Sequence, residues 1–173
     1  MKVGLLDVIS TDGKVMHLNP SFGMDAISFQ AGSFPVLAKS PFSLTIENVG
    51  HKVLDVSGEG SVTVGIPCDR CLREVKVTLP LSLAYRFDMK LPEEELLEEA
   101  DVPCIDGTEL DVDALIYAQI LMDWPMKVLC REECKGLCPS CGKNLNEGPC
   151  GCEDEIKDPR MAAISDIFKK SLQ

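Results

Sequence analysis

The sequence has few aromatic residues and only two histidines. Aromatic residues make up 5% of the 173 positions, and there is a single tryptophan. Stacking of nucleic-acid bases on aromatic side chains therefore has few residues to use. His17 and His51 lie far from the cysteines in sequence, so nothing predicts a thiol nucleophile activated by histidine. The chain also lacks internal repeats and low-complexity tracts.

Long apolar runs are missing as well. No run approaches the ~18 residues that a membrane-spanning helix needs. The opening residues, Met1-Lys2-Val3-Gly4, contain no apolar signal core. We therefore expect a cytoplasmic protein with no membrane partner. Because disulfides form in oxidising compartments, we do not expect the cysteines to be paired covalently.

The charge is strongly negative but unevenly spread. The formal net charge is −11, which argues at first sight against a nucleic-acid partner. Residues 88–113 hold eleven acidic side chains and one basic one, so this acidic segment carries nearly all of the excess. We expect residues 91–106 to form an acidic loop, mobile or partly helical. A segment that mimics or repels phosphate is an alternative.

Against these absences stands an excess of cysteine. Eight of the nine cysteines have metal-ligand spacing, and tetrahedral zinc takes four thiolates. The predicted ligands of two Zn²⁺ ions are Cys68, Cys71, Cys130, Cys134, Cys138, Cys141, Cys150 and Cys152. Cys104 has no partner at ligand spacing and is predicted to be a small buried residue.

Two other chemistries accept such cysteines. A redox Cys-x-x-Cys belongs before a helix in a βαβ unit, whereas Cys68 and Cys71 lie between two strand patterns. An iron–sulfur cluster also takes four cysteines, and it would colour protein purified without oxygen. Zinc is favoured by Gly142 after Cys141, because a glycine there can take a positive φ and let backbone N–H groups point at sulfur.

The preferred grouping of the eight cysteines has one local and one long-range site. Residues 138, 141, 150 and 152 form the compact local set. The other set joins residues 68 and 71 to residues 130 and 134, and would clip the strand-rich half to the C-terminal half. Since metal binding then becomes folding free energy, its removal should lower stability.

Strand patterns dominate residues 41–87. Apolar and polar residues alternate with period two, which is typical of strands with one buried face. Ser57-Gly-Glu-Gly60 predicts a turn, and the order of strands suggests an antiparallel meander. Cys68 and Cys71 then lie at the tip of a hairpin joining 60–66 to 73–87. Pro80 cannot donate to a ladder and marks an edge or a bulge.

The remaining segments are predicted as follows. Val3 to Val8 forms a strand paired with Met16 to Leu18, and residues 21–32 form a loop or short strands. Residues 111–124 form a buried helix, capped by Asp111 and ended by Pro125. Its apolar surface comprises Leu115, Ile116, Gln119, Ile120 and Met122. A last amphipathic helix begins at Asp158.

These segments predict an α+β protein, with an antiparallel β-rich sheet or partial barrel, a few helices and a C-terminal cysteine-rich zinc module. Residues 1–125 form the β-rich part, including the acidic segment 88–113 and the helix 111–124. Residues 126–173 form the zinc module and the C-terminal amphipathic helix. We expect one integrated unit.

Four basic residues are candidates for RNA binding. Arg70, Arg73 and Lys76 sit at or beside the predicted hairpin tip, and Lys143 follows the second cysteine pair. They could contact phosphates, which is how most protein–nucleic acid hydrogen bonds are made. An ordinary solvated rim is the alternative.

Four features together resemble the YceD-like family of large ribosomal RNA subunit accumulation proteins of bacteria and plastids. They are Pro67-Cys-Asp-Arg-Cys71-Leu after a strand, a helix ending in Trp124-Pro125, the block Cys-Lys-Gly-Leu-Cys-Pro-Ser-Cys-Gly-Lys-Asn-Leu-Asn at 134–146, and Asp158-Pro159-Arg160. The resemblance covers roughly residues 40–172. It implies a bacterial cytosolic protein that supports accumulation and processing of large-subunit (23S) ribosomal RNA, with no known enzymatic activity.

Three functional hypotheses result. The first is a zinc-stabilised, non-enzymatic ribosome-assembly factor that binds large-subunit ribosomal RNA or its precursor, or a ribosomal protein on it, and takes no small-molecule substrate. The second is an adaptor that binds basic ribosomal proteins and never touches RNA. The third, an RNA-processing hydrolase, needs an open zinc position, which eight thiolates closing two sites would not leave.

Overall fold

The computed structural model describes residues 1–91 and 104–152. Most of the predicted acidic loop and all of the predicted last helix lie outside the described residues. The described elements, in chain order, are β1 (Lys2–Gly4), α1 (Leu6–Ile9), β2 (Val15–Leu18), β3 (Ala26–Phe29), β4 (Gly32–Lys39), β5 (Ser43–Gly50), β6 (Val53–Pro67), β7 (Glu74–Asp88), β8 (Ile105–Asp106), β9 (Glu109–Asp111) and α3 (Val112–Met122).

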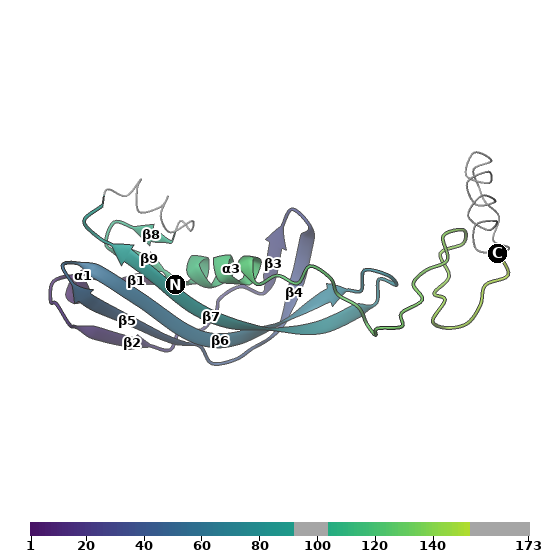
Figure 1. The fold of residues 1–173 in the computed structure, drawn as a ribbon, viewed down its shortest axis with the longest axis horizontal. Helices are drawn as coiled ribbons and strands as arrows, with labels where there is room; N and C mark the ends of the chain where they lie inside the picture. Colours follow the sequence, from purple (N-terminus) through teal and green to yellow (C-terminus); the bar gives the residue numbers. More distant parts are fainter. Residues whose placement is uncertain (92–103, 153–173) are drawn as a thin grey trace, which may run out of the picture.

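The larger sheet is built around β6. All of its pairings are antiparallel, and β7 accompanies β6 from Val53 to Pro67 along its whole length. On the other side, β5 pairs with the first half of β6 and β4 with the second half, which yields the order β2-β5-β6-β4-β3. The two long strands run along most of the molecule (Figure 1). The sheet is open, so the predicted antiparallel sheet is confirmed and the partial-barrel alternative is not.

The turn predicted at residues 57–60 is wrong, because β6 continues through it. The glycines there permit a close approach instead. A Cβ atom on Gly60 would lie 2.1 Å from Cδ2 of Phe42, and one on Gly58 would lie 2.6 Å from the carbonyl oxygen of Ser43. Real Cβ atoms do not approach neighbours so closely. Glycine inside a strand often marks such a backbone approach rather than a break.

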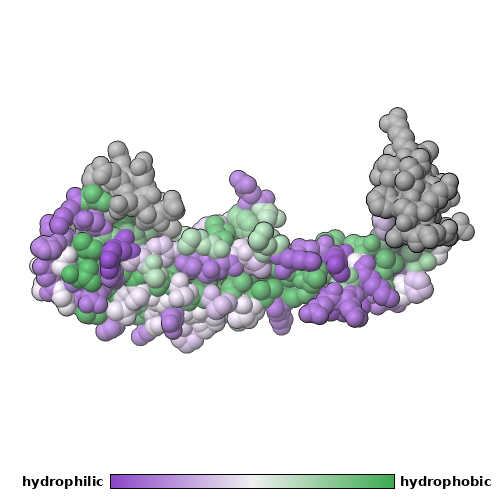
Figure 2. Space-filling model, viewed as in Figure 1, coloured by the Kyte–Doolittle hydropathy of each residue, from purple (hydrophilic) through white to green (hydrophobic). Residues whose placement is uncertain are grey.

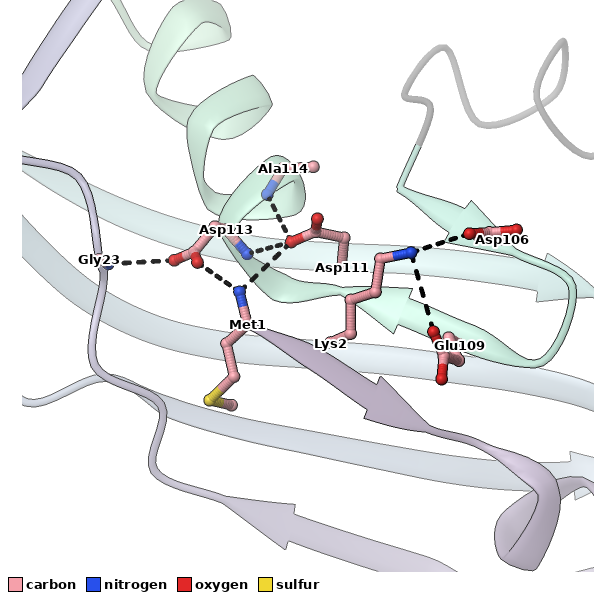
Figure 3. Close-up of polar contacts among 8 residues, drawn as sticks. All are labelled: Met1, Lys2, Gly23, Asp106, Glu109, Asp111, Asp113 and Ala114. Carbon is pink, nitrogen blue, oxygen red and sulfur yellow. Dashed lines mark hydrogen bonds and ion pairs between the residues drawn. The ribbon is translucent and has the colours of Figure 1, made fainter.

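The first residues do not form the predicted strand pair. Lys2–Gly4 is a strand of a second, three-stranded sheet of order β1-β9-β8, and Leu6–Ile9 is helical. The expected partner strand, β2, pairs with β5. The amino group of Met1 contacts the carboxylates of Asp111 and Asp113 (Figure 3). These contacts tie the start of the described chain to the beginning of α3.

Helix α3 begins where predicted. The side chain of Asp111 accepts hydrogen bonds from the backbone N–H groups of Asp113 and Ala114, at 3.1 and 3.3 Å. Such a cap satisfies N–H groups that the first turn leaves free. The helix ends at Met122, two residues before the predicted end. Met122 is 61% exposed, so its predicted place on the buried surface is wrong.

The core lies between α3 and the inward face of the large sheet. α3 packs on β7, and the Tyr85 hydroxyl donates to Oε1 of Gln119 at 2.9 Å. The other buried residues of the predicted helix surface, Leu115, Ile116 and Ile120, have no exposed area. Cys104 is also buried, as predicted, and burial raises the pKa of its thiol to about 11. No helix in the described part of the chain is long and apolar enough to cross a membrane.

Candidate metal centres

The first cysteine pair occupies the turn between the two longest strands. Cys68 follows the end of β6, and Cys71 precedes β7. The backbone N–H of Leu72 donates to the carbonyl of Cys68 at 2.9 Å, and the N–H of Cys68 donates to the carbonyl of Arg73 at 2.8 Å. The predicted position at a hairpin tip is therefore confirmed. Leu72 has a φ of 59°, which is left-handed backbone.

The second pair repeats this turn seventy residues later in a segment without strands. Gly142 N–H donates to the carbonyl of Cys138 at 2.9 Å, and Cys138 N–H donates to the carbonyl of Lys143 at 2.8 Å. Gly142 has a φ of 73°, as its place after Cys141 predicts. Both turns therefore share two hydrogen bonds and a left-handed residue, which is the geometry of a metal-binding knuckle.

Cys68, Cys71, Cys130 and Cys134 come together as the inner cluster. Their sulfur atoms all lie within 4.8 Å of one another. Sγ of Cys68 is 3.9 Å from Sγ of Cys134, and Sγ of Cys71 is 3.5 Å from Sγ of Cys130. Four sulfurs at ~2.3 Å from a tetrahedral zinc ion lie about 3.8 Å apart, so the spacing fits zinc. It is far longer than the ~2.05 Å of a disulfide.

Two side chains hold the inner cluster against the hairpin tip. Asp69 accepts from the N–H of Val128 through Oδ2 at 2.7 Å, and its own N–H donates to the carbonyl of Val128 at 2.9 Å. Arg70 donates from its guanidinium to the carbonyl of Cys134 at 2.8 Å. These contacts join segments about sixty residues apart in the sequence. The inner cluster therefore sits at a junction that the strand-rich part and the cysteine-rich part build together.

Cys138, Cys141, Cys150 and Cys152 form the outer cluster. Their sulfurs also lie within 4.8 Å of one another, and all come from one short segment. Cys138 is buried whereas Cys141 is exposed. In the inner cluster, by contrast, Cys68, Cys71 and Cys134 are all buried. Both predicted groupings of four are therefore present in the structure, in different surroundings.

The pKa values of the clustered thiols indicate that a cation would stabilise each cluster. Burial raises the pKa of the Cys68 thiol. Hydrogen bonds from backbone N–H groups, that of Arg70 first, have the larger combined effect and lower the pKa to about 6. In the outer cluster, N–H groups of Cys141 and Ser140 lower the pKa of Cys138 to about 6. Burial and then the neighbouring Cys71 raise the pKa of Cys130 to about 12. Because adjacent thiolates repel, one cluster cannot hold four of them without a positive ion to balance the charge.

The thiol of Cys152 shows the same effect at the outer cluster. Its hydrogen bond with Cys141 and its burial raise its pKa to about 12. A divalent ion bound by thiolates would reverse this, since a coordinated thiol is deprotonated outright. The donor set is all sulfur, which suits zinc or an iron–sulfur cluster and not a hard cation such as Mg²⁺.

The four predicted phosphate contacts do not form one patch of free cations. Arg70 donates to Cys134, as described, and Lys143 donates from Nζ to the carbonyl of Pro149 at 3.0 Å. Arg73 lies 3.6 Å from the carboxylate of Glu147. Lys76 is exposed on β7. Two of the four therefore stabilise the cysteine-rich segment itself, and their role in RNA binding stays a prediction.

The sequence reasoning missed Asn146, which lies in the chain between Cys141 and Cys150 of the outer cluster and contacts Cys134 of the inner cluster. Its Nδ2 lies 3.3 Å from Sγ of Cys134, and its Oδ1 accepts from the backbone N–H of Lys135 at 2.9 Å. Oδ1 also accepts from the guanidinium of Arg131 at 2.7 Å. An amide that donates to a ligand sulfur and is itself held by neighbours orients that ligand. The sequence signal was an asparagine placed between the ligand pairs of the outer cluster.

Comparison with known proteins identifies the family. The profile of the family described as "Large ribosomal RNA subunit accumulation protein YceD" matches residues 56–168, which include both knuckles and α3. The chain belongs to the YceD family. The resemblance noted in the sequence is thereby confirmed.

Several similar proteins are named as uncharacterized. An uncharacterized protein of Mycobacterium tuberculosis is 29% identical over 156 residues, covering 88% of this chain and 71% of that protein. The uncharacterized protein YlbN of Bacillus subtilis is 26% identical over 106 residues, covering 61% and 60%. No solved structure matches significantly.

One similar protein carries a functional name. It is the "Large ribosomal RNA subunit accumulation protein YCED homolog 1, chloroplastic" of Arabidopsis thaliana. It is 29% identical over 65 residues, which cover 38% of this chain and 20% of that protein. Together with the family description, this name supports a ribosome-related role for the chain.

Proposed function

We propose that this protein is a zinc-stabilised, non-enzymatic ribosome-assembly factor that supports the accumulation and processing of large-subunit (23S) ribosomal RNA in the cytoplasm. The observation that carries the zinc part is the inner cluster, whose sulfur spacing suits a tetrahedral ion. The family description carries the ribosomal part. Each cluster would hold one Zn²⁺ through four thiolates.

Zinc would act here as a structural ion. Four thiolates complete its coordination, so neither site would keep an open position for water or substrate. The inner ion would close the loop between residues 71 and 130 and make 1–125 and 126–173 one integrated unit. Its binding free energy would then contribute to the stability of the whole fold.

Binding to ribosomal RNA or its precursor is the contact that the basic side chains support. Lys76 and Arg73 are exposed beside the first knuckle, where phosphates could reach them. If phosphates dominate the interaction, its affinity must fall steeply as salt rises, because counterions are released on binding. Affinity unchanged between low and high salt would remove Arg70, Arg73, Lys76 and Lys143 as phosphate contacts.

The charge of the metal-binding end favours the adaptor as a second candidate. Residues 68–76 and 126–152 carry seven basic and five acidic side chains, a balance of +2. Each zinc ion with four thiolates has a charge of −2, so the loaded end has a balance of −2. A negative surface attracts basic proteins rather than RNA. Ribosomal proteins bound without direct RNA contact would fit this balance.

Ultraviolet crosslinking in growing cells separates the two modes of contact. After stringent purification, the RNA attached to the protein is sequenced. Enrichment of one large-subunit ribosomal region establishes direct contact and names the site. Absence of crosslinked RNA, with ribosomal proteins still co-purifying under native conditions, establishes the adaptor.

A further inference from the structure

The two knuckles differ at one backbone position. The left-handed residue is Gly142 in the second knuckle and Leu72 in the first, with φ values of 73° and 59°. Glycine takes this conformation freely, whereas a side chain there is strained. The side chain of Leu72 is 67% exposed, so burial in the core does not offset the strain. A strained residue kept at a surface is a reason to look for a function.

Leu72 is part of a larger apolar surface. It lines a groove of ≈ 400 Å³ with Phe34 and Pro67, between the β3–β4 hairpin and the first knuckle. A second groove of ≈ 420 Å³ shares Phe34 and Pro67 and continues to Trp124 and Met126. We name this the Leu72–Met126 surface; its members are Ala31, Phe34, Pro67, Leu72, Trp124 and Met126. Figure 2 shows hydrophobic surface below the hydrophilic tip of the β3–β4 hairpin.

The middle of this surface consists of packed aromatic rings, and its edges are exposed side chains. The ring of Trp124 lies 4.9 Å from the ring of Phe29 and 4.9 Å from that of Phe34, centroid to centroid. Such aromatic clusters hold each other in place. Met126 is fully exposed, at 104% of its reference area. A rigid aromatic base with flexible apolar edges is typical of a protein-binding site.

The charged residues that line the grooves indicate the charge of the partner. The charged residues that line them are Asp69 and Glu74, both acidic. The inner cluster, to which the first knuckle contributes Cys68 and Cys71, would add further negative charge when loaded with zinc. These groups repel phosphate and attract lysine and arginine. We propose that the Leu72–Met126 surface binds a basic protein segment whose apolar side chains enter the two grooves.

This proposal rests on the proposed function, because it assigns the partner to the ribosomal proteins of the large subunit. It adds the surface that binds them, and it does not involve the residues suggested for phosphate contact. Leu72 lies at one end of this surface and Met126 at the other. Asp69 accepts from the backbone N–H of Val128, whereas Glu74 is exposed and makes no ion pair with the residues that the structure describes, so Glu74 is the carboxylate that would pair with a basic side chain.

The test uses the full, zinc-loaded chain and two variants. Leu72→Gly removes the apolar side chain and the backbone strain together, and Met126→Gln keeps the size of a fully exposed side chain while making it polar. Leu6→Gln on α1 is the matched control, since Leu6 is 66% exposed and outside both grooves. The probe is the set of purified, separated proteins of the large ribosomal subunit, titrated against fluorescently labelled chain.

We expect one or a few basic proteins to bind, with affinity at least fivefold weaker for each variant and unchanged for the control. Leu72→Gly should leave the melting temperature unchanged or raise it by up to about 3 °C, because relief of strain offsets the added freedom of the unfolded chain. Weaker binding by Leu72→Gly without a loss of stability would show that Leu72 contacts the partner, because a residue that only supports the fold would lower both. A melting temperature lowered by more than about 3 °C would assign Leu72 to folding and overturn the proposal.

A photocrosslinking residue at position 126 in cells identifies the occupant directly. Crosslinks to a basic ribosomal protein support the proposal. Crosslinks to RNA, to residues 153–173 of the same chain or to a second copy overturn it. Deletion of the gene distinguishes failure of the proposed function from failure of the proposed surface. If deletion leaves 23S ribosomal RNA unchanged, the proposed function is refuted. If deletion causes a defect, and both variants restore it and bind ribosomal proteins normally, only the proposed surface is refuted.

Discussion

The two cysteine clusters share their local geometry and differ in everything around it. Each has a Cys-x-x-Cys knuckle with the same two backbone hydrogen bonds. The inner cluster lies where two distant parts of the chain meet, and three of its four cysteines are buried. The outer cluster is made by one short segment and exposes Cys141. The comparison teaches that a knuckle sets the local geometry of a candidate metal site, whereas its surroundings decide how much of the fold would depend on that site.

The largest expected difference is in stability. Cys71→Ser removes an inner ligand and opens a long loop, whose closure is worth on the order of 4 kcal/mol for a crosslink of this span. Cys141→Ser opens only a local loop, which can unfold without the sheet. We expect the first variant to lower the melting temperature by at least 10 °C and the second by a few degrees. Calorimetry with metal analysis checks this, and equal losses would end the distinction.

Asn146→Ala should weaken the hold of the inner cluster on zinc. Its amide donates to the sulfur of Cys134, and a hydrogen bond to a charged group is worth about 1.5–3 kcal/mol. We expect zinc to leave the inner cluster about tenfold faster when a chelator is added. Release is followed with a colorimetric zinc indicator. Glu147→Gln is the control, because Glu147 is the exposed neighbour of Asn146 and its carboxylate lies 3.6 Å from the Arg73 guanidinium, an ion pair that does not involve the sulfur atoms. Equal release rates for both variants would show that the Asn146 amide does not stabilise the inner cluster.

Gly142→Ala tests the left-handed position of the outer knuckle. A side chain at this φ costs about 1–2 kcal/mol, so zinc affinity at the outer cluster should fall about tenfold. Competition with a calibrated chelator measures it. Gly151→Ala is the matched control, since a Cβ there would meet nothing within 4 Å. A similar loss in both variants would mean that any added side chain disturbs the segment.

The smallest expected effect is the response of the metal-free chain to pH. Cys68 and Cys138 have pKa values lowered to about 6, below the ordinary thiol value of 9.0. A thiol whose pKa is lower in the folded chain than in the unfolded chain stabilises the fold fully above pH 9, and this contribution is lost as the pH falls to about 6. The melting temperature in excess chelator should therefore rise by a few degrees from pH 6 to pH 9. Cys68→Ser with Cys138→Ser should flatten the rise, whereas Cys104→Ala should keep it.

Patterns within a few residues predicted the local structure well. The cap at Asp111, the knuckle at Cys68 and the left-handed Gly142 were all predicted, because each depends on hydrogen bonds between near neighbours. Gly58 and Gly60 were misread as a turn. These glycines are needed because the backbone of Ser43, the first residue of β5, and the ring of the preceding Phe42 approach them closely. Nothing in the neighbouring sequence carries that information.

Partners of short segments were predicted least well. Residues near Val3 carry a strand pattern, but their partner is β9, about a hundred residues later. The phosphate-contact candidates Arg70 and Lys143 were chosen for their charge and their place beside the cysteine pairs, and the structure engages both in holding the cysteine-rich segment. Charge can be read from a sequence, whereas the acceptor that a side chain finds depends on packing.

The sequence by itself determined the cysteines predicted as ligands, their preferred grouping into two sets of four and the alternation that builds the long strands. These features follow from residue type and spacing. Only the tertiary structure decided that one set is buried and the other exposed, that Asn146 contacts Cys134 and that Leu72 faces outward beside Met126. The physical reason is that burial and contact arise where segments far apart in the chain meet. The positions of such meetings follow from the packing of the whole sheet.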